Sequence, residues 1–165
     1  ALADRCQAAV SLGARHNLEM IYVAHCRSTA RLILGLDVGA RLPLARTAMG
    51  RAVLCATPGG EREVLLKRIE VSEGEPPRRL RQRLAEVQKQ FDGRGFVTSE
   101  GEWDPAISAA AVPLDLGDGR NLLGLSVGGA SAWLSGSFLH DEVGPLLVRA
   151  AAEIVSGIHA ADWKD

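Results

Sequence analysis

The segment from residue 41 to residue 56, RLPLARTAMGRAVLCA, contains the residue types that could hold a small anion. Thr47 is a good helix N-cap, because its hydroxyl can accept a hydrogen bond from a backbone N–H of the first turn. The bare amides of a helix N-terminus favour an anion, and Gly50 would let a ligand or another chain segment approach the backbone. An ordinary helix packed through Met49 and Val53 explains the same pattern, so the segment alone leaves both interpretations open.

The sequence shows no pattern typical of catalysis or metal binding. Its four histidines are scattered, and none forms an i, i+4 pair with another histidine or a nearby cysteine. No G-x-S-x-G elbow, no Walker-type phosphate loop and no dinucleotide fingerprint occurs. Cys26 and Cys55 lie in apolar segments, where a thiolate is disfavoured. We therefore expect no catalytic residue, no metal and no cofactor, and a receptor for a small molecule.

The composition predicts one domain without a general affinity for nucleic acid. With 165 residues, 47% of them hydrophobic, the chain can bury a real core, and we expect a single domain over residues 1–165. The 19 basic and 20 acidic residues give a net charge of -1, so contact with DNA would need another segment. Acidic residues interrupt the basic residues of 78–92 and no aromatic residues are interleaved, which favours a solvated helix face over a nucleic-acid patch.

Cysteine usage and the absence of a long apolar run indicate the compartment. Cys6, Cys26 and Cys55 are odd in number and have no metal-ligand spacing, which is typical of reduced thiols in the cytoplasm. The opening ALADRCQAAV lacks the basic start and apolar run of a signal peptide. No stretch approaches the about 18 apolar residues of a membrane span. We expect a cytoplasmic protein without membrane contact.

Hydrophobic periodicity predicts a mixture of helices and strands. Helices are expected at residues 3–15, 48–56, 61–69 and 76–93, followed by a last helix that starts near residue 141. Strands at 18–27 and 31–36 should form a hairpin through the CRST turn. In the first of these strands, alternation places Tyr22 on one face with Ala24 and Cys26, and His25 on the other. Both faces are largely apolar, which predicts a sheet covered on both sides.

A second hairpin is expected within residues 95–129, with its turn at Asp118-Gly119. That turn sets the register of the two strands. The predicted pairs are Ala111 with Ser126, Ala109 with Gly128, Val112 with Leu125 and Ala110 with Val127. The first two pairs share a face lined by small residues, whereas the other two form ordinary core on the opposite face. A ligand pocket and a closely packed helix would each account for the face of small residues.

Three segments of the chain together resemble the effector-binding domain of the IclR family of bacterial transcription regulators. They are VGARLPLARTAMGRAVL, RGFVTSEGEWDPAISAAAVPL and LLGLSVGG, and the resemblance covers nearly the whole chain. The family signature is met by Gly95, Ser99, Glu102, Ala109, Ala111 and Leu114. Ala106, Ala110 and Asp115 depart from it. The resemblance implies an α/β (α+β) fold of GAF-like type, a mostly antiparallel central sheet with helices on both faces.

The resemblance also implies a site and a mechanism. The residues it places around a small carboxylate effector are Leu34, Ala48, Met49, Gly50, Ser99, Ile107, Ala109, Ser126 and Gly128. Effector binding would bias the arrangement of DNA-binding modules within a dimer or tetramer. DNA would be contacted only through an N-terminal winged helix-turn-helix, which this chain lacks. Trp133 and Leu134 are the candidates for a self-association surface.

The same comparison suggests the size of the effector. Family members that take very small keto acids have an Asp, a Cys and a second Ser where this chain has Ser99, Ala109 and Gly128. Each lost buried hydrogen bond costs about 0.5 to 1.5 kcal/mol, and only a larger acid has apolar area to offset that loss. We therefore expect one carboxylate on a body of roughly eight or more heavy atoms, lying against Leu34 and Ile107.

Two other functions are compatible with a GAF-like fold. A sensor module of a signalling enzyme would bind a cyclic nucleotide or another small ligand, and the RLPLARTAMGRA segment argues against it. A cysteine-dependent methionine sulfoxide reductase would require Cys26 or Cys55 to be exposed and mutually reachable.

Overall fold

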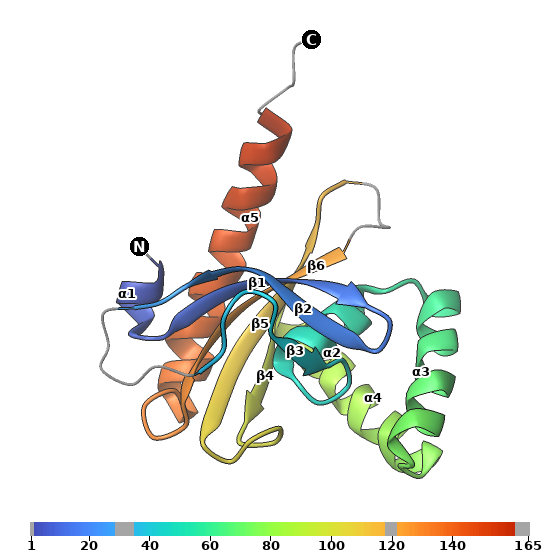
Figure 1. The fold of residues 1–165 in the computed structure, drawn as a ribbon. Coiled ribbons are helices and arrows are strands. Elements are labelled where there is room, and N and C mark those ends of the chain that lie inside the picture. The colour runs from blue at the N-terminus through green and yellow to red at the C-terminus, as the bar shows by residue number, and fades with distance from the viewer. Residues whose placement is uncertain (1, 29–34, 118–121, 161–165) are drawn as a thin grey trace.

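The computed structural model describes residues 2–28, 35–117 and 122–160. In chain order, the elements are α1 (Leu2–Cys6), β1 (Ala9–His16), β2 (Glu19–Cys26), β3 (Arg41–Pro43), α2 (Ala48–Ala56), α3 (Gly59–Glu73), α4 (Pro77–Arg94), β4 (Val97–Glu100), β5 (Ile107–Asp115), β6 (Leu122–Ala130), a π-helical turn (Phe138–Val143) and α5 (Gly144–Ala160). The strands form one antiparallel sheet in the order β3-β2-β1-β6-β5-β4. As Figure 1 shows, α2, α3 and α4 lie on one side of the sheet and α5 lies on the other. The predicted fold class is confirmed.

Each face of the sheet has its own apolar core. Met49 and Val53 of α2 pack on one face, and a Cβ added to Gly124 would overlap the Met49 side chain, so the missing side chain of Gly124 allows α2 to approach the sheet closely. On the opposite face, Val112 and Val127 pack against Leu147 of α5. Burial of large apolar side chains on both faces is the main stabilising contribution to this fold, at about 25 cal/mol per Å².

The predicted helix over residues 3–15 is wrong beyond Cys6. The chain leaves α1 through Gln7, which has a positive φ of 49°, and residues 9–16 form β1. β1 lies between β2 and β6 and exchanges hydrogen bonds with both. Pairing on both edges outweighs the weak helical stripe of this segment, because tertiary context overrides local propensity.

The neighbours of β2 also differ from the prediction. Residues 31–34 of the expected strand 31–36 lie outside the described residues, and Leu36 belongs to no strand. The strands that pair with β2 are β1 and β3. Met20 pairs with Leu42 of β3, so the RLP segment supplies the partner strand.

A bulge in β2 changes which side chains face α2. Gly13 pairs with Tyr22, but the preceding residue of β1, Leu12, pairs with Ala24, so β2 contains one extra residue at this point. Ser11 then pairs with His25. The expected grouping of Tyr22 with Ala24 is therefore wrong, and Tyr22 shares the α2 face with His25.

The second hairpin and most of the helices follow the prediction closely. The register of β5 and β6 is confirmed at every predicted pair, whereas its turn at 118–119 lies outside the described residues. α4 ends at Arg94, one residue beyond the expected end, with Gly95 in the left-handed conformation. α3 is longer than expected. The last helix continues directly from a π-helical turn, and Pro145, the second residue of α5, follows that turn immediately.

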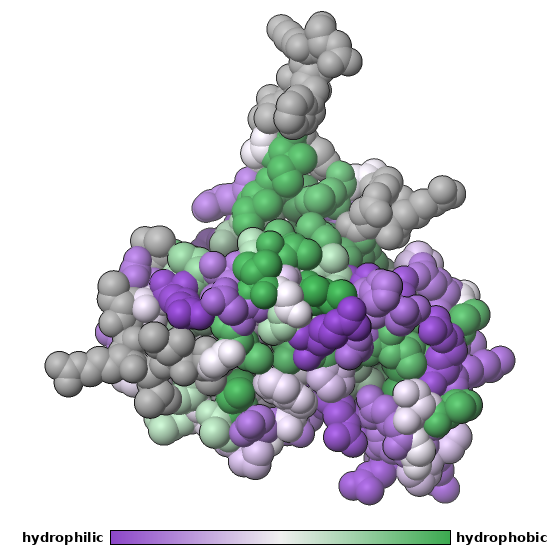
Figure 2. Space-filling model, viewed as in Figure 1, coloured by the Kyte–Doolittle hydropathy of each residue, from purple (hydrophilic) through white to green (hydrophobic). Residues whose placement is uncertain are grey.

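The last helix extends past the sheet, and its end is apolar on the surface. Ile154 and Ile158 are exposed rather than buried. Figure 2 shows apolar residues along α5 that continue onto the neighbouring sheet surface. Leu134, one of the two expected surface residues, is fully buried, whereas Trp133 is half exposed. No helix in the described ranges is long and apolar enough to cross a membrane.

Candidate functional site

The N-terminus of α2 is capped as the sequence predicts. Thr47 Oγ1 accepts from the Gly50 N–H at 3.2 Å and donates to the Pro43 carbonyl at 3.0 Å. Among the described residues, nothing accepts a hydrogen bond from the amides of Ala48 and Met49. These two amides therefore remain available to an anion at the positive end of the helix dipole.

The start of α2 lies over a small cavity against the sheet, which we call the sheet pocket. Its lining residues are Tyr22, Leu36, Leu42, Thr47, Ala48, Met49, Ser99, Trp103, Ile107, Ala109, Ser126 and Gly128, and its volume is about 40 Å³. Seven of the nine residues implicated by resemblance are among them: Ala48, Met49, Ser99, Ile107, Ala109, Ser126 and Gly128. The face of small residues on the β5–β6 hairpin therefore forms part of the wall of a real cavity.

The remaining two of the nine residues are not among these described lining residues. Leu34 lies outside the described residues. Gly50 instead packs against the main chain of Leu44, where an added Cβ would lie 2.7 Å from the carbonyl carbon. Its missing side chain thus allows a chain segment to approach, which is the other of the two possibilities that the sequence left open.

Tyr22 is a pocket residue that sequence reasoning missed. Burial raises the pKa of its phenol, and the neighbouring Ser11 and Ser126 side chains oppose part of that rise. Ser11 Oγ lies 2.9 Å from His25 Nδ1, and the His25 ring stacks on Tyr22 with centroids 5.9 Å apart. The only sequence signal was the tyrosine itself among apolar neighbours, and the β2 bulge hides the fact that His25 belongs to the same face.

Ser99 supplies a polar group without a partner. Its side chain is 5% exposed, and no hydrogen bond to it occurs within the described part of the chain. A buried hydroxyl normally finds a partner. The orientation of Ser99 toward the sheet pocket therefore leaves a donor and acceptor for a bound molecule.

The loop between β4 and β5 closes one wall of the sheet pocket. Trp103 lies in this loop and packs against the α2-side core. The adjacent Glu102 pairs with Arg51 of α2 at 2.7 Å, and Arg51 Nε donates to the Ala45 carbonyl at 3.0 Å. Because Arg51 is 3% exposed, it links the loop, the start of α2 and the segment before it from within the protein. Trp103 and this link were not predicted.

The cysteines and acidic residues do not form a reactive centre in the described ranges. No group of three or more His, Cys, Asp or Glu side chains there could hold a metal ion. Cys26 lies on the α5 side of the sheet, paired with Val10, whereas Cys55 lies among α2, α3 and α4. Burial raises the pKa of Cys55 to about 11, so its thiol is neutral near pH 7.

A family model described as "Bacterial transcriptional regulator IclR C-terminal" matches residues 1–156. The chain belongs to the IclR family. It is 25% identical over 163 residues to the HTH-type transcriptional regulator TsaQ1/TsaQ2 of Comamonas testosteroni, covering 98% of this chain and 59% of that protein. The chain thus spans about three-fifths of the length of this relative.

Solved IclR structures share the fold. An IclR family transcriptional regulator from Brucella abortus is 34% identical, with a TM-score of 0.85 over 98% of this chain and 59% of that chain. The Thermotoga maritima IclR structure has a TM-score of 0.80 at 22% identity, covering 95% of this chain and 64% of that one. The chain is therefore the effector-binding domain of an IclR-type transcription regulator and not an enzyme, so neither the sulfoxide reductase nor the signalling-enzyme module applies.

Proposed function

We propose that this IclR domain senses an organic monocarboxylate bound in the sheet pocket. The observation that carries the proposal is the convergence of three unpaired polar groups on one cavity. The amides of Ala48 and Met49 would hold the carboxylate, because they lie at the positive end of the α2 dipole. The Ser99 hydroxyl would donate to the same carboxylate or to a neighbouring oxygen, and Ile107 would contact the apolar part.

The volume of the sheet pocket bears on effector size. A water molecule needs roughly 10 to 15 Å³ of such space, so about 40 Å³ holds a few waters and no larger molecule without movement. An effector of eight or more heavy atoms therefore requires a wall to move outward. The walls built from loops carry Trp103 and Leu36, and these are the parts we expect to shift.

The proposed response is a change in the arrangement of protomers. An effector shifts such an equilibrium only by its difference in affinity between two arrangements, which is commonly about 1 to 3 kcal/mol. We propose that self-association uses the apolar end of α5, with Ile154 and Ile158, together with the half-exposed Trp133. Leu134 no longer supports this surface, because it is buried. DNA would be contacted by the part of the regulator that these 165 residues do not include.

A thermal-shift series with glyoxylate, pyruvate, benzoate and phenylacetate tests the proposal. A ligand at 100 times its dissociation constant stabilises the protein by about 2.7 kcal/mol, which is readily measured. Ser99→Ala should reduce the stabilisation, whereas Ser137→Ala, at an exposed position, should not. Gly128→Leu should abolish it without unfolding the free protein. Stabilisation by glyoxylate or pyruvate alone would refute the size prediction, and undiminished stabilisation in Gly128→Leu would refute the site.

A further inference from the structure

We infer that the domain has a second ligand site, a groove between α3 and α4 that takes a monocarboxylate with an apolar body. This helical groove is lined by Leu54, Cys55, Gly59, Arg62, Glu63, Leu66, Arg81, Leu84, Ala85, Gln88, Lys89 and Asp92. It has no lining residue in common with the sheet pocket. The inference therefore goes beyond the proposed function and does not depend on it.

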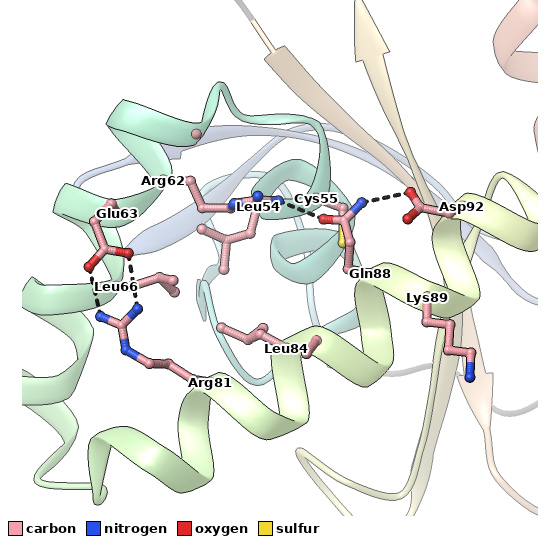
Figure 3. A pocket seen from close by; sticks show the side chains of 12 residues that line it. Leu54, Cys55, Arg62, Glu63, Leu66, Arg81, Leu84, Gln88, Lys89 and Asp92 are labelled. Carbon is pink, nitrogen blue, oxygen red and sulfur yellow. Dashed lines mark hydrogen bonds and ion pairs between the residues drawn. The ribbon is translucent and has the colours of Figure 1, made fainter.

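The groove is held open by two polar bridges between α3 and α4. At one end, Glu63 of α3 accepts from both terminal nitrogens of Arg81 of α4, at 2.8 and 3.0 Å. At the other end, Arg62 donates to Gln88 at 2.6 Å, and Gln88 in turn donates to Asp92 at 2.8 Å. Figure 3 shows these bridges on either side of the space. Long side chains thus span a gap that direct packing of the two helices would have closed.

Between the bridges, the floor of the groove is apolar. Leu54 of α2 and Leu66 of α3 are almost fully buried, and Leu84 of α4 is partly exposed. Figure 3 shows the three leucine side chains between the Glu63–Arg81 bridge and the Arg62–Gln88 bridge. The groove has a volume of about 520 Å³, within the roughly 300 to 1,000 Å³ of small-molecule sites. It is more than ten times as large as the sheet pocket of about 40 Å³.

The charges around the groove select the ligand class. Arg81 is neutralised by Glu63 and by Glu70, which accepts from its Nε at 2.9 Å. Arg62 bonds only to the neutral amide of Gln88, and no carboxylate in the described ranges pairs with it. Its guanidinium keeps free donors at the edge of an apolar floor. A carboxylate matches such a guanidinium geometrically, since both are planar and can form two parallel hydrogen bonds.

Cys55 provides a reporter inside the groove. In a Cys26→Ser background, the remaining cysteines are Cys6, which is buried, and Cys55, which is only partly buried. Alkylation by iodoacetamide at pH 9, measured by mass spectrometry of the intact protein, reports access to Cys55. Because iodoacetamide is neutral, it does not compete with a carboxylate for Arg62. Saturating 2-naphthoate should slow alkylation of Cys55 at least tenfold, because the ring would cover the thiol from above Leu84.

Three variants test the details of the helical groove. Arg62→Gln should raise the dissociation constant of 2-naphthoate at least tenfold, whereas Arg68→Gln, an exposed position on the same helix, should leave it unchanged. Gly128→Leu, in the sheet pocket, should also leave protection intact, which separates this site from the proposed effector site. Neutral 2-naphthamide should protect far less than the acid.

Two results would overturn the inference. One is alkylation of Cys55 at the same rate with and without 2-naphthoate. The other is protection that persists in Arg62→Gln but disappears in Gly128→Leu, because the acid would then act from the sheet pocket. Circular dichroism of each variant ensures that altered protection does not reflect unfolding, and a crystal soaked with 2-naphthoate would locate the ring directly.

Discussion

Gly50→Ala is expected to destabilise the domain, although alanine is the better helix former. Gly50 lies in the first turn of α2, directly against the segment that leads into that helix. A Cβ at this position would lie 2.7 Å from both the Cα and the carbonyl carbon of Leu44, and closer still to its carbonyl oxygen. All three are main-chain atoms, so no side-chain rotation relieves the contact.

Two opposing contributions determine how much Gly50→Ala changes the free energy of unfolding. Helix propensity favours alanine over glycine by about 1 kcal/mol. Overpacking costs about 1 to 3 kcal/mol and occasionally more. We expect the upper end of that range, because Leu44 is fully buried and its N–H donates to the Leu18 carbonyl at 2.9 Å. The net loss should be about 2 kcal/mol, equivalent to about 4 to 8 °C in Tm for a domain of this size.

Urea unfolding of Gly50→Ala beside Gly157→Ala measures the effect. Gly157 lies in α5 with open space around its added Cβ, so alanine there should gain about 0.4 to 1 kcal/mol. If Gly50→Ala were as stable as the parent, the close approach of Leu44 would not be real, and the space at Gly50 would again be available to a ligand. Displacement of α2 in the variant should also weaken effector binding, since Ala48 and Met49 would move.

Three further outcomes are expected. Glu102→Gln should destabilise the domain by up to about 1 kcal/mol in low salt and less in high salt, as measured by urea unfolding, because Glu102 is half exposed while its partner Arg51 is buried. Stability should fall as pH rises from the ordinary thiol pKa of 9.0 toward the raised pKa of about 11, because the unfolded chain releases the Cys55 proton first, and Cys55→Ala should show a smaller fall. A mobility-shift assay should show no tight, salt-sensitive binding of operator DNA by these 165 residues alone, given their net charge of -1.

The sequence by itself determined the features that depend on local geometry. The Asp118-Gly119 signal specified the register of β5 and β6, because a two-residue turn leaves only one pairing. The N-cap at Thr47 followed from the chemistry of one hydroxyl before an apolar helix. Together with the family resemblance, these features predicted that Ala109, Ser126 and the start of α2 lie around one site, and all of them line the sheet pocket.

The tertiary structure alone decided the features that depend on distant segments. Residues 9–16 form a strand because β2 and β6 pair with both of its edges, and nothing within the segment encodes those partners. The β2 bulge places Tyr22 and His25 on one face, since a single extra residue reverses the alternation from which faces are predicted. The Arg51–Glu102 link joins residues 51 positions apart, and the Glu63–Arg81 bridge of the helical groove joins residues 18 positions apart. Neither contact follows from the local sequence, because each depends on how separate elements pack in the folded chain.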